Sequence, residues 1–535
     1  MNNDNKVVIG IDVGSGSVRS GIFDLEGKLI THTVKKISVF HRSGNRVEQS
    51  STEIWHAICH CVRQCLRMSG TKAENVVGLG FDATCSLVLV GKNGHPLAIS
   101  ADGKDDQNII VWMDHRATRQ AEGINDTHHP VLKYVGGKIS PEMETPKLLW
   151  LKEHRQEVYN NAWQFFDLVD YLTWRATDDL TRSICTVTCK WTWLAHENRW
   201  DPDYFHTIGL GDLADEGFKR IGQSMAAPGT PCGKGLTKGA ANELGLLVGT
   251  PVAIGMIDAH AGGIGTAGVG DGALSNLAYV FGTSSCTMTS TLEATAVPGV
   301  WGPYYSAMLP GYWLNEGGQS AAGASIDQLL AMHPMGGVAS GMAAKEGISL
   351  PVFLANLAQE KSVTPSAAVE MARGLHVLPE FLGNRAPLAN PNTRAVIAGL
   401  GMERDMDSLV ALYIAGLCGI GYGLRQIVDA QHAEGIKTDS IVISGGAGRH
   451  TLVRQILADA CELPVILTTC SEPVLLGAAI LGAVAAGITP SLVSAMQQFT
   501  HKEQTYSVSN TYRGTHKRRY ESYQRLQQTA IMLQA

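Results

Sequence analysis

Apolar residues in the first ninety positions occur as short runs and alternations that glycine-rich turns interrupt. Runs of four to eight such residues between turns are typical of β-strands, whereas a longer run with a 3.6-residue period is typical of a helix. The predicted elements are strands at 7–13, 17–24, 76–81 and 87–90, a further strand from Leu29, and a helix over 52–68.

The same kinds of pattern continue through the rest of the chain. They predict strands at 252–256, 276–281, 286–288 and 441–443, and helices after Asp258 and over 405–434, 451–461 and 517–533. Strands mixed with helices in this way indicate an α/β fold with buried sheets. The strand–turn–strand units that begin at Val7 and Asn276 predict two related domains that face each other. We expect an N-terminal domain over 1–255, a C-terminal domain over 256–495 and a C-terminal helical tail over 496–535.

Composition narrows the class of protein. Charged residues make up 17% of the 535 positions, below the roughly 25% of average soluble domains, which rules out intrinsic disorder. The net charge of −6 gives no reason to expect a nucleic-acid partner. The longest apolar run, 474–488, is shorter than the roughly 20 residues of a membrane span, and the first residues are polar. Eleven cysteines without a Cys-x-x-Cys pair are typical of reduced thiols. We therefore expect a cytoplasmic enzyme without a membrane partner.

The first turn carries candidate chemistry. Asp12 ends the first strand, and Gly14 and Ser15 follow it. Backbone N–H groups freed in such a turn can surround phosphate oxygens, and the carboxylate can hold Mg²⁺, usually through water. The alternative is an ordinary β-hairpin with turn glycines. No Gly-x-x-x-x-Gly-Lys-Ser/Thr string is present, so a P-loop enzyme is not indicated.

Two later turns have the same character. Gly282, Thr283 and Ser284 separate two strands, and Gly445 and Gly446 lie between a strand and a helix. The start of a helix flanked by glycines can accept a phosphate or ribose group, although each turn alone is also a simple connection. Three such turns, with acidic residues at strand ends, predict nucleotide binding.

The combination of these motifs resembles the FGGY carbohydrate kinases, a branch of the actin-like ATPase superfamily. The matching elements are the turn after Asp12 as far as Arg19, Trp112 with Asp114 and Arg116, Asp167 with Asp170, Asp258 as far as Gly265, Gly282 to Ser284, 383–392, Ser444 to Gly448, and Glu472 to Gly477. The resemblance covers almost the whole chain. It implies two ribonuclease-H-like domains with a cleft between them, ATP and Mg²⁺ as cofactors, and a small sugar as the acceptor.

One stretch points to a sub-family. Thr84 to Val88 resembles the element of the D-ribulose kinase branch, and the Arg-Glu pair of glycerol kinases is absent from it. The resemblance implies a sugar site made of Asp82, Ala83, Lys190, Asp258 and Glu316. The alternatives are a turn carboxylate for Asp82 and a surface ammonium for Lys190.

Within that resemblance, Asp258 is the base that accepts the proton of the attacking hydroxyl. The small residues after it leave space for a substrate. Its alternative role is a helix N-cap, for which Asp is well suited. A carboxylate at a helix start is expected to have a low pKa, which still suits phosphoryl transfer.

The implied reaction is the phosphorylation of D-ribulose to D-ribulose 5-phosphate. L-Ribulose, D-xylulose, ribitol and glycerol remain as competing acceptors, and the resemblance allows a homodimer. An actin- or Hsp70-like ATPase without a sugar substrate is the alternative from another class, as is an inactive binding protein on the same scaffold. Loss of Asp12 or Asp258 would indicate the inactive protein, and both are present.

Two clusters imitate functional sites. His56, Cys59, His60, Cys61 and Cys65 suggest a metal site, but helical spacing separates the histidines from Cys61 and Cys65, so an amphipathic helix is favoured over zinc. Residues 516–519, a histidine followed by three basic residues, are predicted to be solvated on the last helix rather than to bind nucleic acid.

Overall fold

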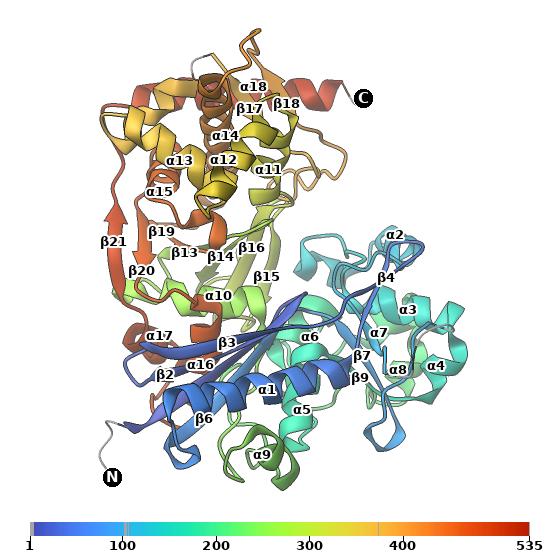
Figure 1. Ribbon diagram of the computed structural model, residues 1–535. Helices are drawn as coiled ribbons and strands as arrows, with labels where there is room; N and C mark the ends of the chain where they lie inside the picture. Colours follow the sequence, from blue (N-terminus) through green and yellow to red (C-terminus); the bar gives the residue numbers. More distant parts are fainter. Residues whose placement is uncertain (1–4, 101–103, 105, 373, 534–535) are drawn as a thin grey trace.

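The computed structural model describes residues 5–100, 104, 106–372 and 374–533. Two lobes lie against each other, each built on its own central sheet (Figure 1). The N-terminal lobe is blue to green in the figure, and most of the C-terminal lobe is yellow to red. The predicted α/β fold with two domains is confirmed.

The central sheet of the N-terminal lobe has the strand order β12-β6-β1-β2-β3. Its strands are β1 Val7–Val13, β2 Ser17–Asp24, β3 Leu29–Lys36, β6 Val76–Ala83 and β12 Met256–Ile257. The first three strands pair antiparallel, and β6 and β12 extend the sheet in parallel from β1. Every residue of β1 is buried. Helices cover both faces of the sheet, which explains this continuous apolar run.

The central sheet of the C-terminal lobe repeats this plan. Its strands, in spatial order, are β15 Trp301–Tyr305, β16 Trp313–Gln319, β14 Ser285–Thr291, β13 Asn276–Phe281, β19 Ser440–Ser444, β20 Val465–Thr468 and β21 Lys502–Tyr506. β13, β14 and β16 pair antiparallel, and β19 and β20 continue in parallel from β13. Three antiparallel strands followed by two parallel ones define the ribonuclease-H-like topology in both lobes.

The remaining elements surround these sheets. The N-terminal lobe also contains β4 Phe40–Arg42, β5 Arg46–Gln49, α1 Ser51–Ser69, β7 Leu87–Gly91, β8 Ile109–Ile110, α2 Thr118–Asp126, α3 Glu144–His154, α4 Gln156–Asn161, β9 Ala162–Asp167, α5 Leu168–Thr177, β10 Arg182–Ser183, α6 Ile184–Trp191, α7 Pro202–Thr207, α8 Gly211–Asp215, β11 Met225–Ala226 and α9 Lys238–Leu244. Next come α10 Asp258–Ala267, α11 Gly323–Met332, α12 Gly336–Lys345, α13 Leu350–Lys361, β17 His376–Leu378, β18 Val396–Ala398, α14 Met406–Ala433, α15 Thr451–Cys461, α16 Pro473–Ala485, α17 Leu492–Phe499 and α18 Arg513–Met532.

Helix α1 confirms the helix predicted over 52–68. Ser50 caps it by accepting a hydrogen bond from the Glu53 N–H. Cys61 and Cys65 are buried, while His56 and His60 are exposed. Within the described residues no group of three or more His, Cys, Asp or Glu suits a metal ion. The sulfur-rich segment is therefore the apolar face of a helix, as predicted.

The strand predicted at 252–256 is wrong in extent. Only Met256 and Ile257 form a ladder with β6. Before them, Ala253 donates to Leu79, whereas Ile254 donates to Thr230 and Val252 accepts from Cys232. The hydrogen bonds of this apolar segment are thus divided between β6 and a neighbouring loop, which its composition does not reveal.

Helix α14 is the longest helix among the described residues. It is long and apolar enough to cross a membrane, but 89% of its apolar window is buried inside the protein. The segment packs against α11, α13 and α15 of the C-terminal lobe. It is therefore the core helix of this lobe.

The domain limits stay a prediction. The structure shows which elements the segments near these limits contact. The predicted division after Gly255 falls directly before β12, the edge strand of the first sheet. Beyond residue 495, β21 is the edge strand of the second sheet, and α18 packs beside α14 and α15.

The prediction of a solvated basic run on α18 is wrong for two of its four residues. His516 is fully buried, and its Nδ1 lies 3.0 Å from the Tyr422 hydroxyl. Arg519 is buried as well, with a hydrogen bond to the Leu375 carbonyl. Helical spacing places both on the face that α18 turns toward α14.

Close backbone packing holds α16 between the lobes. A side chain at Gly10 in β1 would overlap the Leu475 carbonyl of α16, and one at Gly477 would overlap the Ala261 carbonyl of α10. The absence of a Cβ at these positions lets α16 touch the first sheet on one side and α10 on the other.

We predict that Gly10→Ala lowers the free energy of unfolding by about 1–3 kcal/mol, the usual cost of overpacking a core. Denaturant titration measures this change. Gly341→Ala, on α12 with no atom within 4 Å of the added carbon, is the control and should be neutral or stabilising. Equal stability of the two variants would contradict the packing role of Gly10.

Candidate active site

The two lobes meet at a cavity of ≈ 300 Å³, which we term the cleft cavity. Seven of the residues singled out from the sequence line it: Asp12, Gly14, Ser15, Lys190, Asp258, Ser284 and Glu316. A second cavity of ≈ 470 Å³ in the C-terminal lobe, the C-lobe cavity, is lined by Gly282, Thr283 and Gly446. The turn between β13 and β14 therefore borders both cavities.

Strand register brings the acidic residues of the N-terminal lobe together. Asp12 pairs with Asp82 across β1 and β6, and Asp82 pairs with Met256 of β12. Asp258 follows two residues later, as the first residue of α10. Because these strands are parallel, their carboxyl ends lie at one edge of the sheet, and Asp12 and Asp258 reach the same cavity.

Asp82 and Ala83 do not line the cleft cavity, although Thr84 and Cys85 do. Asp82 is fully buried, and its oxygens accept no hydrogen bond from the described residues. Burial and the nearby charges of Asp12 and Asp258 raise the pKa of Asp82 well above its usual range. These surroundings favour the protonated form of the carboxyl group, which does not reach the cavity. Sugar-binding roles for Asp82 and Ala83 stay predictions.

Asp258 lies at the start of α10, and its Oδ1 accepts a hydrogen bond of 2.7 Å from the Ala259 N–H. The low pKa expected for a helix start is wrong. Burial and the charge of Asp12 raise the pKa of Asp258 to about 6, and the Ala259 N–H, His260 and Lys190 lower it only in part. Desolvation outweighs the helix end because the carboxylate faces an enclosed cleft.

Cationic side chains gather opposite these carboxylates. Lys190 on α6 is buried, so the surface ammonium considered as an alternative is wrong. Its Nζ lies 5.3 Å from the centre of the Trp301 ring, and the Arg385 guanidinium lies 5.5 Å from the same centre. Burial favours the neutral amine, but Cys85 and Glu316 outweigh it and raise the Lys190 pKa. Lys190 therefore presents a charged ammonium to the cavity.

Arg19 connects the turn after β1 to the C-terminal lobe. Its Nε lies 3.1 Å from Asp12 Oδ2, and its Nη1 donates to Glu472 Oε2 over 3.2 Å. Glu472 directly precedes α16. An ion pair shared between lobes fixes the Asp12 carboxylate against the helix that separates the two sheets.

The turn after β1 is held from the N-terminal lobe. The Trp112 indole donates to the Ser15 hydroxyl over 2.9 Å, and the Gln49 amide donates to the Ser15 carbonyl over 2.7 Å. Behind Trp112, the buried Arg116 pairs with Asp114 at 2.7 Å and Glu48 at 3.0 Å. The Trp-x-Asp-x-Arg element thus supports the shape of this turn.

The C-lobe cavity begins where β13 and β19 end. Gly445 has φ +93°, and a side chain there would overlap the Phe281 carbonyl, so only glycine fits. Gly446 is exposed, and a side-chain carbon added there would have no atom within 4 Å. Gly282 and Thr283 form the opposite wall, and their carbonyls accept hydrogen bonds from Gly323 and Ala322. Gly445 shapes this cavity without lining it.

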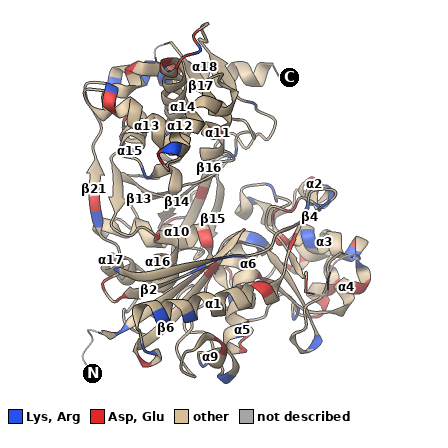
Figure 2. Ribbon diagram, in the orientation of Figure 1, with Lys and Arg blue, Asp and Glu red and all other residues tan. Residues whose placement is uncertain are grey.

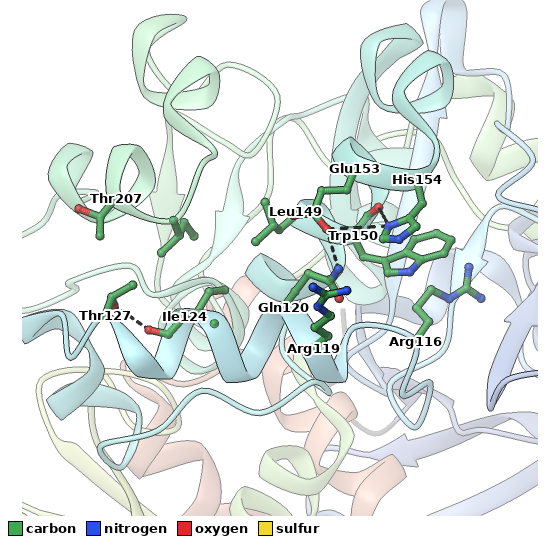
Figure 3. Close-up of a pocket in the computed structure, with 12 residues that line it drawn as sticks. Arg116, Arg119, Gln120, Ile124, Thr127, Leu149, Trp150, Glu153, His154 and Thr207 are labelled. Carbon is green, nitrogen blue, oxygen red and sulfur yellow. Dashed lines mark hydrogen bonds and ion pairs between the residues drawn. The ribbon is translucent and has the colours of Figure 1, made fainter.

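A third cavity, of ≈ 650 Å³, lies in the N-terminal lobe between α2 and α3 (Figure 3). Gln120 and Glu153 join the two helices through a hydrogen bond of 2.7 Å. Asp12 and Asp258 do not line this cavity, despite its larger volume. Figure 2 shows acidic and basic residues interspersed over both lobes, in agreement with the net charge of −6.

Several residues of the cleft cavity received no role from the sequence. Arg19, Trp112 and Arg385 lay within recognised motifs, but Glu142, Cys286 and Trp301 lay outside them. Burial raises the Glu142 pKa, but His115, Arg385 and Lys190 outweigh it and lower that pKa. Only spatial proximity reveals Glu142, because no spacing rule links it to its partners.

Comparisons with known proteins agree with this architecture. Residues 7–265 match the N-terminal domain, and residues 277–486 the C-terminal domain, of the FGGY family of carbohydrate kinases. An FGGY carbohydrate kinase domain-containing protein of Homo sapiens is 42% identical over 504 residues, covering 92% of this chain and 91% of that protein. A D-ribulokinase of Saccharomyces cerevisiae is 37% identical over 515 residues, covering 90% of this chain and 72% of that protein. The xylulose kinase of Lactobacillus acidophilus, 19% identical, superimposes with a TM-score of 0.81 over 98% of both chains.

Two ribonuclease-H-like lobes around a carboxylate-lined cleft define the fold of the actin-like ATPase superfamily. The chain belongs to the FGGY family of carbohydrate kinases, and it is a sugar kinase.

Proposed function

We propose that this kinase transfers the terminal phosphoryl group of ATP to a ketopentose, and that D-ribulose is the acceptor. The products are D-ribulose 5-phosphate and ADP. The observation that carries the proposal is the cleft cavity, where Lys190, Asp258 and Glu316 lie with Ser15 and Ser284 of the two phosphate turns. Similarity to the yeast D-ribulokinase supports the choice of acceptor.

Asp258 acts as the general base. Its carboxylate accepts the proton of the sugar O5 hydroxyl while that oxygen forms a bond to the terminal phosphorus. The bond between this phosphorus and the β,γ-bridging oxygen breaks, and ADP leaves with the electron pair. Such transfers have a loose transition state, so positioning and charge neutralisation contribute most of the rate.

Mg²⁺ fits the residues present. Asp12 and Asp258 bring carboxylate oxygens to one cavity, and oxygen is the donor type that this ion prefers. Asp12 would hold the ion, through water, because this nearly buried residue lines the cleft cavity together with Gly14 and Ser15. The bound ion supplies neutralisation of the charge on the transferring phosphate.

The two cavities divide the substrates between the lobes. The sugar lies in the cleft cavity, and the nucleoside lies in the C-lobe cavity near Gly446, with its phosphates along Gly282 to Ser284. Closure of the lobes over both substrates keeps water from competing as the acceptor. All eleven cysteines are free thiols, which favours the cytoplasm as the compartment.

The proposal is tested by ADP release over a panel of D-ribulose, L-ribulose, D-xylulose, ribitol and glycerol, with and without Mg²⁺. We expect D-ribulose to give the highest kcat/KM, and Mg²⁺ to be required. A preference for glycerol would overturn the choice of acceptor. ATP hydrolysis that no sugar stimulates would indicate the Hsp70-like alternative.

Asp258→Asn is predicted to lower kcat by about 10²–10⁴, the usual contribution of a positioned base. Folding and ATP binding should be unchanged, because asparagine keeps the size of the side chain and can still accept the Ala259 N–H. Steady-state kinetics and a nucleotide-binding titration measure both. Near-normal turnover of a folded variant would exclude Asp258 as the base.

The pH profile provides a second readout of the same residue. Asp258 faces Asp12 from β1, Asp82 from β6, Lys190 from α6 and His260 from its own helix. Since its pKa is about 6 in the protein without substrates and the base must be ionised, kcat/KM should be full above pH 7 and fall about tenfold per pH unit below 6. The residual rate of Asp258→Asn should lack this decrease.

Substitutions in the two cavities should affect the KM values of the two substrates differently. Lys190→Met should raise the KM for the sugar by about 10–100-fold, the worth of a charged hydrogen bond, and leave the KM for ATP near its original value. Gly446→Leu fills open space in the C-lobe cavity and should raise the KM for ATP instead. If both variants changed the same KM, the division of substrates would be wrong.

A further inference from the structure

Three buried side chains form a chain of contacts behind the cleft cavity. Cys185 Sγ on α6 lies 3.0 Å from His260 Nδ1 on α10, and His260 Nε2 lies 3.2 Å from Glu316 Oε2 on β16. Cys185 is fully buried, and His260 and Glu316 are 1% and 7% exposed. The contacts join the N-terminal lobe to the C-terminal lobe through a single imidazole ring.

The backbone holds the Cys185 end of this chain. The Ser183 hydroxyl caps α6 by accepting from the Cys185 N–H and donates to the Gly255 carbonyl over 2.6 Å. The Ile257 N–H donates to Cys185 Sγ over 3.5 Å. Helix α6 is thereby fixed against β12, and Cys185 has little freedom to leave His260.

The Glu316 end is open. Glu316 lines the cleft cavity, and its side-chain hydrogen bond within the described part of the chain, to His260, uses Oε2 and not Oε1. Its two oxygens therefore differ: Oε2 is held by His260, and Oε1 is available to a ligand. A carboxylate oxygen in this state accepts a hydrogen bond from a hydroxyl group.

We propose that His260 is a positioning residue: its Nε2–H fixes Glu316 Oε2, so that Oε1 is aimed at a hydroxyl of the bound sugar. Cys185 orients the imidazole from the other side. The proposal rests on the proposed function in one respect, namely that the ligand of the cleft cavity is a polyhydroxylated sugar.

The charges around the ring support this arrangement. Burial lowers the pKa of His260, but Cys185 and Glu316 outweigh it and raise that pKa to about 10. Burial raises the pKa of Glu316, but His260, Lys190 and Arg385 lower it to about 2. An imidazolium donates from both nitrogens, to the sulfur and to the carboxylate, and the neutral Nε2–H tautomer likewise donates to Glu316 while it accepts the Cys185 S–H at Nδ1.

Two amide substitutions of His260 test the contacts of its two ring nitrogens separately. In His260→Gln, the amide nitrogen comes close to the position of Nε2 and can still donate to Glu316. In His260→Asn, it comes close to Nδ1, so the contact with Cys185 remains and the donor to Glu316 is lost. Both variants remove the ring and its charge, so any difference between them reports the hydrogen bond to Glu316.

We expect the KM for the sugar in His260→Gln to stay within about threefold of the wild-type value, and to rise about 10–100-fold in His260→Asn. The KM for ATP should be alike in both variants. Equal sugar KM values in Gln and Asn would overturn the proposal. His516→Gln, at a buried histidine bonded to Tyr422 away from the cleft, is the control for stability and should leave both KM values unchanged.

Cys185→Ser and Cys185→Ala provide a second pair should a His260 variant not fold, as judged by its thermal unfolding midpoint. Serine keeps a polar partner for Nδ1, so the sugar KM should rise several-fold more in the alanine variant. Equal values in this pair would overturn the role of Cys185 in orienting the ring.

A spectroscopic measurement separates this proposal from the proposed function. Nitrogen-15 NMR of histidine-labelled wild type should show both ring nitrogens of His260 protonated at pH 7.5, and the Nε2 resonance should shift in Glu316→Gln. An unprotonated Nε2 would overturn the proposal even if the kinase phosphorylates D-ribulose. The expected spectrum with no sugar-stimulated activity would uphold the pairing and reject the proposed function.

Discussion

Direct backbone contact between α16 and its neighbours determines how the two lobes can be arranged. Gly10 allows the Leu475 carbonyl to lie against β1, and Gly477 allows the Ala261 carbonyl of α10 to lie against α16. With these helices fixed, Asp258 at the start of α10 and Glu472 before α16 have defined positions relative to Asp12. The cleft is therefore built by packing, and its chemistry follows from where the two helices begin.

The buried charged side chains of the cleft cavity need neighbours of opposite charge, because burial disfavours their ionised forms. Arg19, Lys190 and Arg385 face Asp12, Glu142, Asp258 and Glu316 in one cavity. Desolvation alone would neutralise most of these groups, and it does raise the pKa of Asp82 strongly, because the charge of Arg19 is outweighed there by Asp12 and Asp258. Lys190 keeps its charge because Cys85 and Glu316 raise its pKa, and Glu316 keeps its charge because His260 and Lys190 lower its pKa. The mixed charge thus maintains an ionised site among buried side chains.

Most of the fold follows from local patterns. The strands around Asp12 and Gly282, and the helices at 52–68 and 451–461, were predictable because periodicity and turn glycines are local properties. The strand at 252–256 was overestimated because its hydrogen-bond partners lie on two different segments. A local pattern also cannot show that His516 and Arg519 face a neighbouring helix.

The residues of the candidate site that lie within sequence motifs were predictable, and the others were not. Asp12, Lys190, Asp258 and Glu316 converge on the cleft cavity, whereas Asp82 does not line it, although it pairs with Asp12 in the sheet. The raised pKa of Asp258 depends on desolvation, which no sequence position encodes. The contact of Cys185 with His260 joins residues 75 positions apart, so only the folded chain reveals it.

The position of α16 has a consequence for synthesis on the ribosome. The first sheet is complete at Ile257, but α16, which covers one of its faces, comprises Pro473–Ala485. Throughout the elongation between these two segments, the nascent N-terminal lobe carries an uncovered apolar surface that includes buried positions of β1. Holdase chaperones bind such surfaces, so the growing chain of this kinase is a suitable client for them until α16 has emerged.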